Sequence, residues 1–425
     1  MTIYYTIPES RSGTTPSSTC PVYKTFEEFK KIANKVVKAV GTKNLPPGKS
    51  KWKAKDFLTV LIYGWLRGKS PDDASDKLNK LAIEKGWFHP KTFADGRKSR
   101  AVPHQTQVND WLGEMDLAQA KKLQRAVFSV ALREAKKKGI LPRDLILEYD
   151  TTVRGYWGRR RDKHIKGTTK VAGTHHARQY HGAMVHGGGV ALYVALDHVA
   201  KGESKVPFML DTAAWLKRLG FKVNWVLMDR EYYSYHALAD FKAKGIDVVT
   251  VAKDYAQLRR AKEAYISGRK GRVQEFIVTS GAKKGQAAKS VQCWVVLYPK
   301  KKYHLQAIFR DFRNGAMTID QACKRLYGLI TTAPPQGHGK KFPALIRRLY
   351  RTRWKIETGY RIADVKHCSW RSDRDVTRFM DELGRMYLLQ DAWSDQRATD
   401  PRGNALTLEK FRDELIDAGT CQLNA

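Results

Sequence analysis

Apolar residues recur at intervals of three and four in the first third of the chain. Phe29, Ile32, Val36 and Val40 fall on one side of a helix that begins near the Thr25 and Glu28 capping pair. The same spacing predicts further helices at about 57–66, 73–81, 104–111 and 117–138. The second and third helices, separated by a break containing Gly and Pro, are compatible with a helix-turn-helix. We therefore predict an arm at 1–22 and an all-α N-terminal domain at 23–142.

The pattern changes to short β-prone runs from Leu145 onward. Strands are predicted at 145–150, 179–185, 190–196, 222–228 and 246–251, and helices at 208–219 and 235–244. The glycines at 187–189 join the second and third strands as a hairpin. Strand, hairpin, helix, strand, helix, strand is the order of a ribonuclease-H-like mixed sheet. In that architecture the first and fourth strands are neighbours.

Residues 254–340 interrupt this order. We expect strands at 273–278, 291–298 and 303–309, and then a helix at 319–329 and a loop. The predicted fold class is therefore α/β, with an all-α N-terminal domain, a ribonuclease-H-like core and a mostly β insertion. The core occupies 143–253 and 341–395, the insertion occupies 254–340, and a tail follows at 396–425.

The charge of the chain indicates what kind of partner it binds. It carries 78 Lys and Arg against 42 Asp and Glu, a formal net charge of +36. An excess this large repels itself in the folded state unless a polyanion neutralises it, so we expect nucleic acid as the partner. No apolar stretch approaches the roughly 18 residues of a membrane-spanning helix, so we expect no membrane partner.

The N-terminus and the cysteines indicate the compartment. Residues 1–18 lack the basic-then-apolar order of a signal peptide. The five cysteines are scattered and form no C-x-x-C pair, which supports neither a disulfide framework nor a zinc ribbon. We expect reduced thiols and a cytoplasmic location with access to DNA.

Three carboxylates are the candidates for chemistry. Asp150 and Asp229 each close an apolar run, and Glu357 lies on a helix far along the chain. Paired divalent cations prefer such hard oxygen ligands, and a two-metal site transfers phosphoryl groups. Each residue also has a plain structural interpretation. The aspartates could cap strand ends, and Glu357 could belong to an ordinary ion-pair ladder with Arg353 and Arg361 at i−4 and i+4.

Three motifs together resemble a known family. They are Asp150-Thr151-Thr152, Asp229-Arg230-Glu231-Tyr232-Tyr233 and Tyr350-x-x-Arg353-Trp354-x-Ile356-Glu357. Over about 145–393 the chain resembles the DDE transposases of cut-and-paste insertion sequences, and in particular the insertion-sequence-four-like group with a Tyr-Arg-Glu-Lys signature. The chain departs from that signature at Asp364, where the family has Lys, and the nearest cations are Lys366 and Arg361.

The resemblance implies specific roles. Asp150, Asp229 and Glu357 would hold two Mg²⁺ ions, with Mn²⁺ as a substitute. Phosphates of the transposon end would be held by Tyr350, Arg353 and either Lys366 or Arg361. An unstacked base would lie against Trp354, Tyr232, Tyr233 or Trp225. Further DNA contacts are expected from Arg230 and, as a basic run after the first aspartate, from Arg159, Arg160 and Arg161.

The resemblance implies a transposase that binds terminal inverted repeats of double-stranded DNA, cleaves there and joins 3′-hydroxyl ends to target DNA. The family implies a homodimer in the synaptic complex and a prokaryotic, nucleoid-associated location. Two alternatives are open. One is a ribonuclease-H-like metal nuclease without strand transfer, and the other is a catalytically silent, transposase-derived DNA-binding protein.

Overall fold

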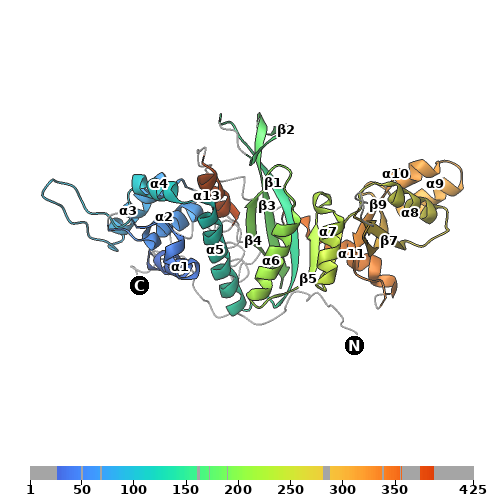
Figure 1. Cartoon of the computed structure of the whole chain (residues 1–425), viewed down its shortest axis with the longest axis horizontal. Coiled ribbons are helices and arrows are strands. Elements are labelled where there is room, and N and C mark those ends of the chain that lie inside the picture. The colour runs from blue at the N-terminus through green and yellow to red at the C-terminus, as the bar shows by residue number, and fades with distance from the viewer. Residues whose placement is uncertain are drawn as a thin grey trace. The chain divides into compact units, whose positions relative to one another are not determined.

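The computed structural model of the chain is shown in Figure 1. The residues that it describes are 26–48, 51–67, 69–159, 163–171, 173–188, 190–280, 288–336, 339–354, 356 and 374–386. The chain divides into two compact units. Unit 1 comprises Met1–Ile7, Arg143–Asp150 and Glu203–Glu357, and unit 2 comprises Pro8–Pro142, Thr151–Gly202 and Thr358–Ala425.

The helical part of unit 2 matches the helices predicted from the sequence. Its helices are α1 (Phe26–Val40), α2 (Ala54–Arg67), α3 (Pro71–Glu84), α4 (Gln105–Glu114) and α5 (Leu117–Lys137). Local signals account for their starts, since Ser70 caps α3 ahead of a proline, and Asp116 forms a capping box with Gln119 on α5. Phe57 stacks on Trp111 at 5.2 Å between ring centroids, which joins α2 to α4.

The strands of unit 2 form an antiparallel group. The long strand β3 (Thr174–Gly187) pairs along its first part with β2 (Ile165–Val171) and along its second part with β4 (Val190–His198). The predicted hairpin between β3 and β4 is therefore confirmed. Strand β2 was not predicted, because its sequence is polar and most of its residues are only partly buried or exposed, so it lacks the apolar alternation of a core strand.

Helix α13 (Asp375–Met386) packs within unit 2 on a buried polar framework. Arg154 makes a bidentate contact with Glu382, with nitrogen–oxygen distances of 2.6 and 3.0 Å. Asp375 at the start of the helix accepts from Arg178 and lies 3.0 Å from Nδ1 of His164. Gly384 lies against the indole of Trp65 on α2, where any larger side chain would overlap the ring. The described part of α13 ends at Met386.

Unit 1 is built on a mixed sheet. Its strand order is β1-β5-β6-β9-β8-β7, where β1 (Asp144–Gly155) contributes its first seven residues. Strands β1, β5 (Lys222–Met228) and β6 (Asp247–Val251) are parallel. Strands β9 (Leu326–Thr331), β8 (Ser290–Pro299) and β7 (Val273–Thr279) continue the sheet in antiparallel pairing. The strands predicted within 254–340 thus extend the same sheet as the core strands.

Helices cover both faces of this sheet. On one face Trp225 and Leu227 of β5 form a core cluster with α11 (Phe342–Thr352), to which Ile146 of β1 adds. Alternate residues of a strand point to opposite faces, so Tyr149 lies on the other face. Its ring contacts Phe208 of α6 (Val206–Arg218) and Phe241 of α7 (Tyr235–Ala243) at 6.0 and 6.5 Å.

The prediction of a mostly β segment at 254–340 is wrong in its secondary structure. The segment contains α8 (Ala256–Ile266), α9 (Leu305–Arg313) and α10 (Ile319–Lys324) among the three strands. The expected strand at 303–309 is α9, in which Leu305, Ile308, Phe309 and Phe312 follow a helical period. The expected helix at 319–329 ends at Lys324, after which β9 begins. Gly328 fits β9 between the side chains of Leu258 and Val295.

Each helix among the described residues is too short or too polar to cross a lipid bilayer.

Candidate functional site

Asp150 and Asp229 lie at matching positions on two neighbouring parallel strands of unit 1. The register pairs Tyr149 of β1 with Met228 of β5, and each aspartate is the next residue. Adjacent strands are about 5 Å apart, so the two Cα atoms are close neighbours. Asp229 keeps an extended backbone, with φ −71° and ψ 164°. The two aspartates therefore lie on the same face of the sheet, which is the face covered by α11.

The chain immediately after Asp229 fixes the backbone at Asp150. A 3₁₀ turn at Arg230–Tyr232 redirects the chain beyond β5, and the hydroxyl of Tyr232 donates to the carbonyl oxygen of Asp150 at 2.9 Å. The ring of Tyr232 lies 6.1 Å from that of Tyr149, whose hydroxyl donates to the carbonyl oxygen of Met209 at 2.6 Å. Buried aromatic rings with satisfied hydroxyls hold this edge of the sheet in place.

Arg353 reaches the same edge from the end of α11. Its Nη1 lies 3.7 Å from Oδ2 of Asp150, and the two side chains are only 7% and 12% exposed. The guanidinium also lies 5.4 Å from the ring of Tyr350. Because solvent screens this pair weakly, the positive charge offsets much of the repulsion that two adjacent carboxylates create.

Two lysines that the sequence analysis missed contact the residues that follow Asp229. Lys205 lies 2.7 Å from Glu231 and 4.7 Å from the ring of Tyr232. Lys253 follows β6, the third parallel strand, and lies 5.5 Å from the ring of Tyr233. Burial raises the pKa of Tyr233, so its phenol stays protonated. The position of Lys253 beyond a parallel strand is a signal that the sequence already carried, because the carboxyl ends of parallel strands share one edge.

The aromatic and basic residues predicted to contact DNA are placed in different ways. Tyr232, Tyr233 and Trp225 are buried, whereas Trp354 is 59% exposed. Arg230 in unit 1 and Arg159 in unit 2 are exposed. Their contacts with DNA stay predictions. Glu357, Arg160, Arg161, Arg361 and Lys366 lie outside the described residues.

The two aspartates fit a divalent cation by the chemistry of their donors. Hard cations take carboxylate oxygens, and two carboxylates at adjacent strand ends supply them from one side. Within the described part of the chain, His, Cys, Asp and Glu form no group of three or more that could hold a metal ion. The third predicted ligand, Glu357, lies outside the described residues and so outside this statement.

Comparisons with known proteins address the identity of the chain. Residues 150–389, more than half of the chain, match the family described as transposase DDE domain. A solved structure, the Drosophila P element transposase strand transfer complex, is 10% identical, with 94% of this chain and 97% of that chain covered at a TM-score of 0.25. A TM-score this low carries no structural argument. No match was found among the curated proteins. On the strength of the family match, the chain belongs to the transposase DDE domain family.

Proposed function

We propose that this transposase binds the ends of its element, cleaves the DNA there and joins the 3′-hydroxyl ends to target DNA. The observation that carries the proposal is the position of Asp150 and Asp229 after paired residues of neighbouring parallel strands. Carboxylates in that arrangement suit phosphoryl transfer, and membership of the DDE family supports DNA as the substrate.

The strand arrangement supports a ribonuclease-H-like core. In unit 1 the parallel strands β1, β5 and β6 alternate along the chain with α6 and α7, and in unit 2 β3 and β4 form the hairpin of such a fold. The Tyr350, Arg353 and Glu357 motif further supports the insertion-sequence-four-like group. We retain the functional division into an N-terminal domain for end binding or dimer contacts, a core at 143–253 and 341–395, and an insertion at 254–340.

Asp150, Asp229 and Glu357 would hold two Mg²⁺ ions, or Mn²⁺ in their place. Bound there, the ions supply activation of water or of a DNA 3′-hydroxyl and stabilise the leaving oxygen. The remaining residues position this edge. Arg353 holds the carboxylate of Asp150 from one side, and Tyr232 fixes its backbone from another.

The exposure of the aromatic residues narrows the DNA contacts. Trp354 is the exposed candidate for stacking on an unstacked base. Tyr232 and Tyr233 are buried and support the sheet edge that carries the two aspartates. Arg230 and Arg159 are exposed and suited to backbone phosphates. Glu357 and the cations Lys366 and Arg361 complete the proposed site. The active form proposed is a homodimer that holds both ends, in a prokaryotic cytoplasm at the nucleoid.

The test uses the DNA that flanks the reading frame on both sides, incubated with full-length protein and Mg²⁺. Wild-type protein should nick the element ends and, given target DNA, produce joined products. Asp150→Asn and Asp229→Asn should abolish both products while leaving DNA binding in place, because affinity comes from many cationic contacts. Asp211→Asn, an exposed acid on α6 of the same unit, serves as the charge-matched control.

The alternatives predict different products. A metal nuclease would release hydrolysed ends without joining them to target DNA. A silent DNA-binding protein would bind and leave the DNA intact. Cleavage that persists in both aspartate variants would overturn the proposed site.

A further inference from the structure

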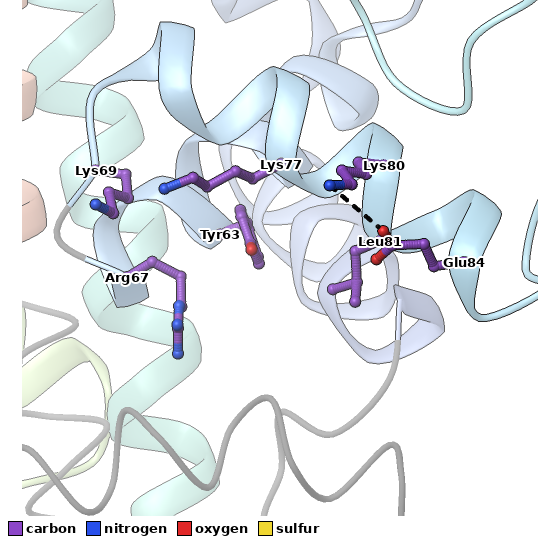
Figure 2. A pocket seen from close by; sticks show the side chains of 7 residues that line it. All are labelled: Tyr63, Arg67, Lys69, Lys77, Lys80, Leu81 and Glu84. Atoms are coloured by element: carbon purple, nitrogen blue, oxygen red, sulfur yellow. Dashed lines mark ion pairs between the residues drawn. The ribbon is translucent and has the colours of Figure 1, made fainter.

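A hollow lined by basic side chains lies between two helices of unit 2, far along the chain from the aspartates. Its volume is about 300 Å³, and it is lined by residues of α2, α3 and the linker between them (Figure 2). The lining includes Tyr63, Arg67, Lys69, Lys77, Lys80 and Glu84. Four cationic side chains around one small space favour the binding of an anion, so the pocket is a candidate anion-binding site.

The acidic residues beside the pocket only partly balance these cations. Lys69 and Lys77 lie 3.6 and 3.7 Å from the same carboxylate, that of Asp73. Lys80 lies 3.7 Å from Glu84, the pair drawn with a dashed line in Figure 2. The two carboxylates of Asp73 and Glu84 are thus shared among three lysines. Exposed ion pairs are weak and easily exchanged for a stronger anion.

The other acidic residues of α3 are engaged on a different side of the helix. Asp72 accepts from Asn109 at 2.8 Å, and Asp76 accepts from Arg100 at 2.7 Å. Ala74 and Leu78 fill the buried side. Lys77 and Lys80 thus lie on the side of α3 that faces the pocket, together with Asp73 and Glu84.

The backbone around the pocket is fixed in advance. Gly64 on α2 allows close approach to α3, since a Cβ there would lie 2.9 Å from that of Ala74. The amide of Lys69 donates to the carbonyl oxygen of Gly64 at 2.7 Å, and Ser70 caps α3. A fixed backbone lowers the entropy that binding costs, because only side chains must be ordered.

Tyr63 lines the pocket from its buried side. Burial raises the pKa of its phenol, against the opposing charge of Arg67, so the hydroxyl stays protonated at neutral pH. A phosphate oxygen accepts hydrogen bonds from hydroxyl, ammonium and guanidinium groups alike. The lining therefore offers a phosphate the donors that it prefers.

We propose that this pocket binds a phosphate of the DNA backbone, so that α2 and α3 hold DNA without reading its sequence. The inference rests on the proposed function, which supplies DNA as the partner. The first turn of α3 carries Asp72 and Asp73. In a recognition helix the N-terminal residues contact base edges, whereas here Asp72 accepts from Asn109 and Asp73 pairs with Lys69 and Lys77, so α3 acts on the backbone through the lysines of its later turns.

The experiment measures binding of full-length protein to a fluorescent duplex of arbitrary sequence across a series of salt concentrations. The test variant is Lys77→Gln with Lys80→Gln, and both lysines are exposed. The matched control is Lys136→Gln with Lys137→Gln, which removes the same two charges from exposed positions at the end of α5. Circular dichroism establishes that both variants fold.

The test variant should bind about tenfold more weakly at moderate salt, and its slope of log K against log salt should be shallower by about 1 to 2. The control should stay close to wild type. Equal losses in the two variants, or no loss in the test variant, overturn the inference. So does tight binding of inorganic phosphate alone, abolished in the test variant while duplex binding is unchanged, because the pocket would then serve a small anion.

Failure of this inference is distinguishable from failure of the proposed function. If wild-type protein binds and cleaves DNA while the test variant equals the control, only the phosphate pocket is rejected. If wild-type protein binds no duplex even at low salt, the proposed function itself is rejected, and the pocket proposal falls with it.

Discussion

The pair formed by Arg154 and Glu382 is expected to hold helix α13 within unit 2. Nε and Nη2 of Arg154 lie 3.0 and 2.6 Å from Oε1 of Glu382, and the carboxylate side chain is 3% exposed. Replacing Arg154 with Met removes the cation and leaves a buried carboxylate. Breaking a buried pair from one side costs about 3–5 kcal/mol, and because Arg154 keeps 20% of its surface in water we expect about 3 kcal/mol.

The assay is hydrogen exchange of the α13 amides, read by mass spectrometry. A cost of about 3 kcal/mol corresponds to roughly a hundredfold faster exchange in Arg154→Met, since about 1.4 kcal/mol is a factor of ten. The double variant Arg154→Met with Glu382→Leu should recover most of the protection, because no uncompensated charge remains. Arg133→Met, at an exposed position on α5, is the control. If α13 in Arg154→Met exchanged as slowly as in the control, the pair would not hold the helix.

Three further predictions concern pH, packing and thiol chemistry. Burial, helped by the charge of His164, lowers the pKa of His198 to about 3. The unfolded chain therefore binds the proton first, and stability present above pH 6.5 falls by roughly 1 kcal/mol per unit towards pH 3. Urea titrations at several pH values should show this slope in wild type and lose it in His198→Phe. A slope unchanged by the substitution would contradict the assignment. Gly384→Ala should overlap Trp65 and undock α13, giving fast exchange of its amides, whereas normal protection would show that the contact accommodates a methyl group. Burial raises the pKa of Cys293 to about 12 and of Cys323 to about 11, so iodoacetamide should modify neither at pH 8 until urea is added, and modification in the native protein would refute their burial.

Much of the architecture could be predicted from the sequence, because most elements carry a clear period. The helices of the N-terminal region and the β3–β4 hairpin followed from apolar spacing and glycine placement. Two kinds of element could not be predicted: strands that bury little apolar surface, and short helices and strands that follow each other closely along the chain. Strand β2 is polar, and β9 follows α10 after a single residue, so the two appeared as one helix.

The candidate site divides in the same way. Asp150 and Asp229 could be brought together from the sequence, because the strand order makes their strands neighbours. The contact between Arg353 and Asp150 could not, because it joins residues two hundred positions apart through the packing of α11 on the sheet. The four-residue spacing in the sequence predicted only that Arg353 lies on the same helix face as Glu357. The structure shows that its guanidinium lies against Asp150.

The central claim is that Asp150 and Asp229 share a divalent-cation site, and iron-mediated cleavage of the protein backbone tests it directly. Fe²⁺ takes the oxygen ligands that Mg²⁺ takes, and with ascorbate and peroxide it cuts the chain beside its own binding site. We expect cuts next to both aspartates, suppressed by excess Mg²⁺ and lost in Asp150→Asn. Cuts confined to other parts of the chain, or cuts at these positions that survive the substitution, would contradict the account.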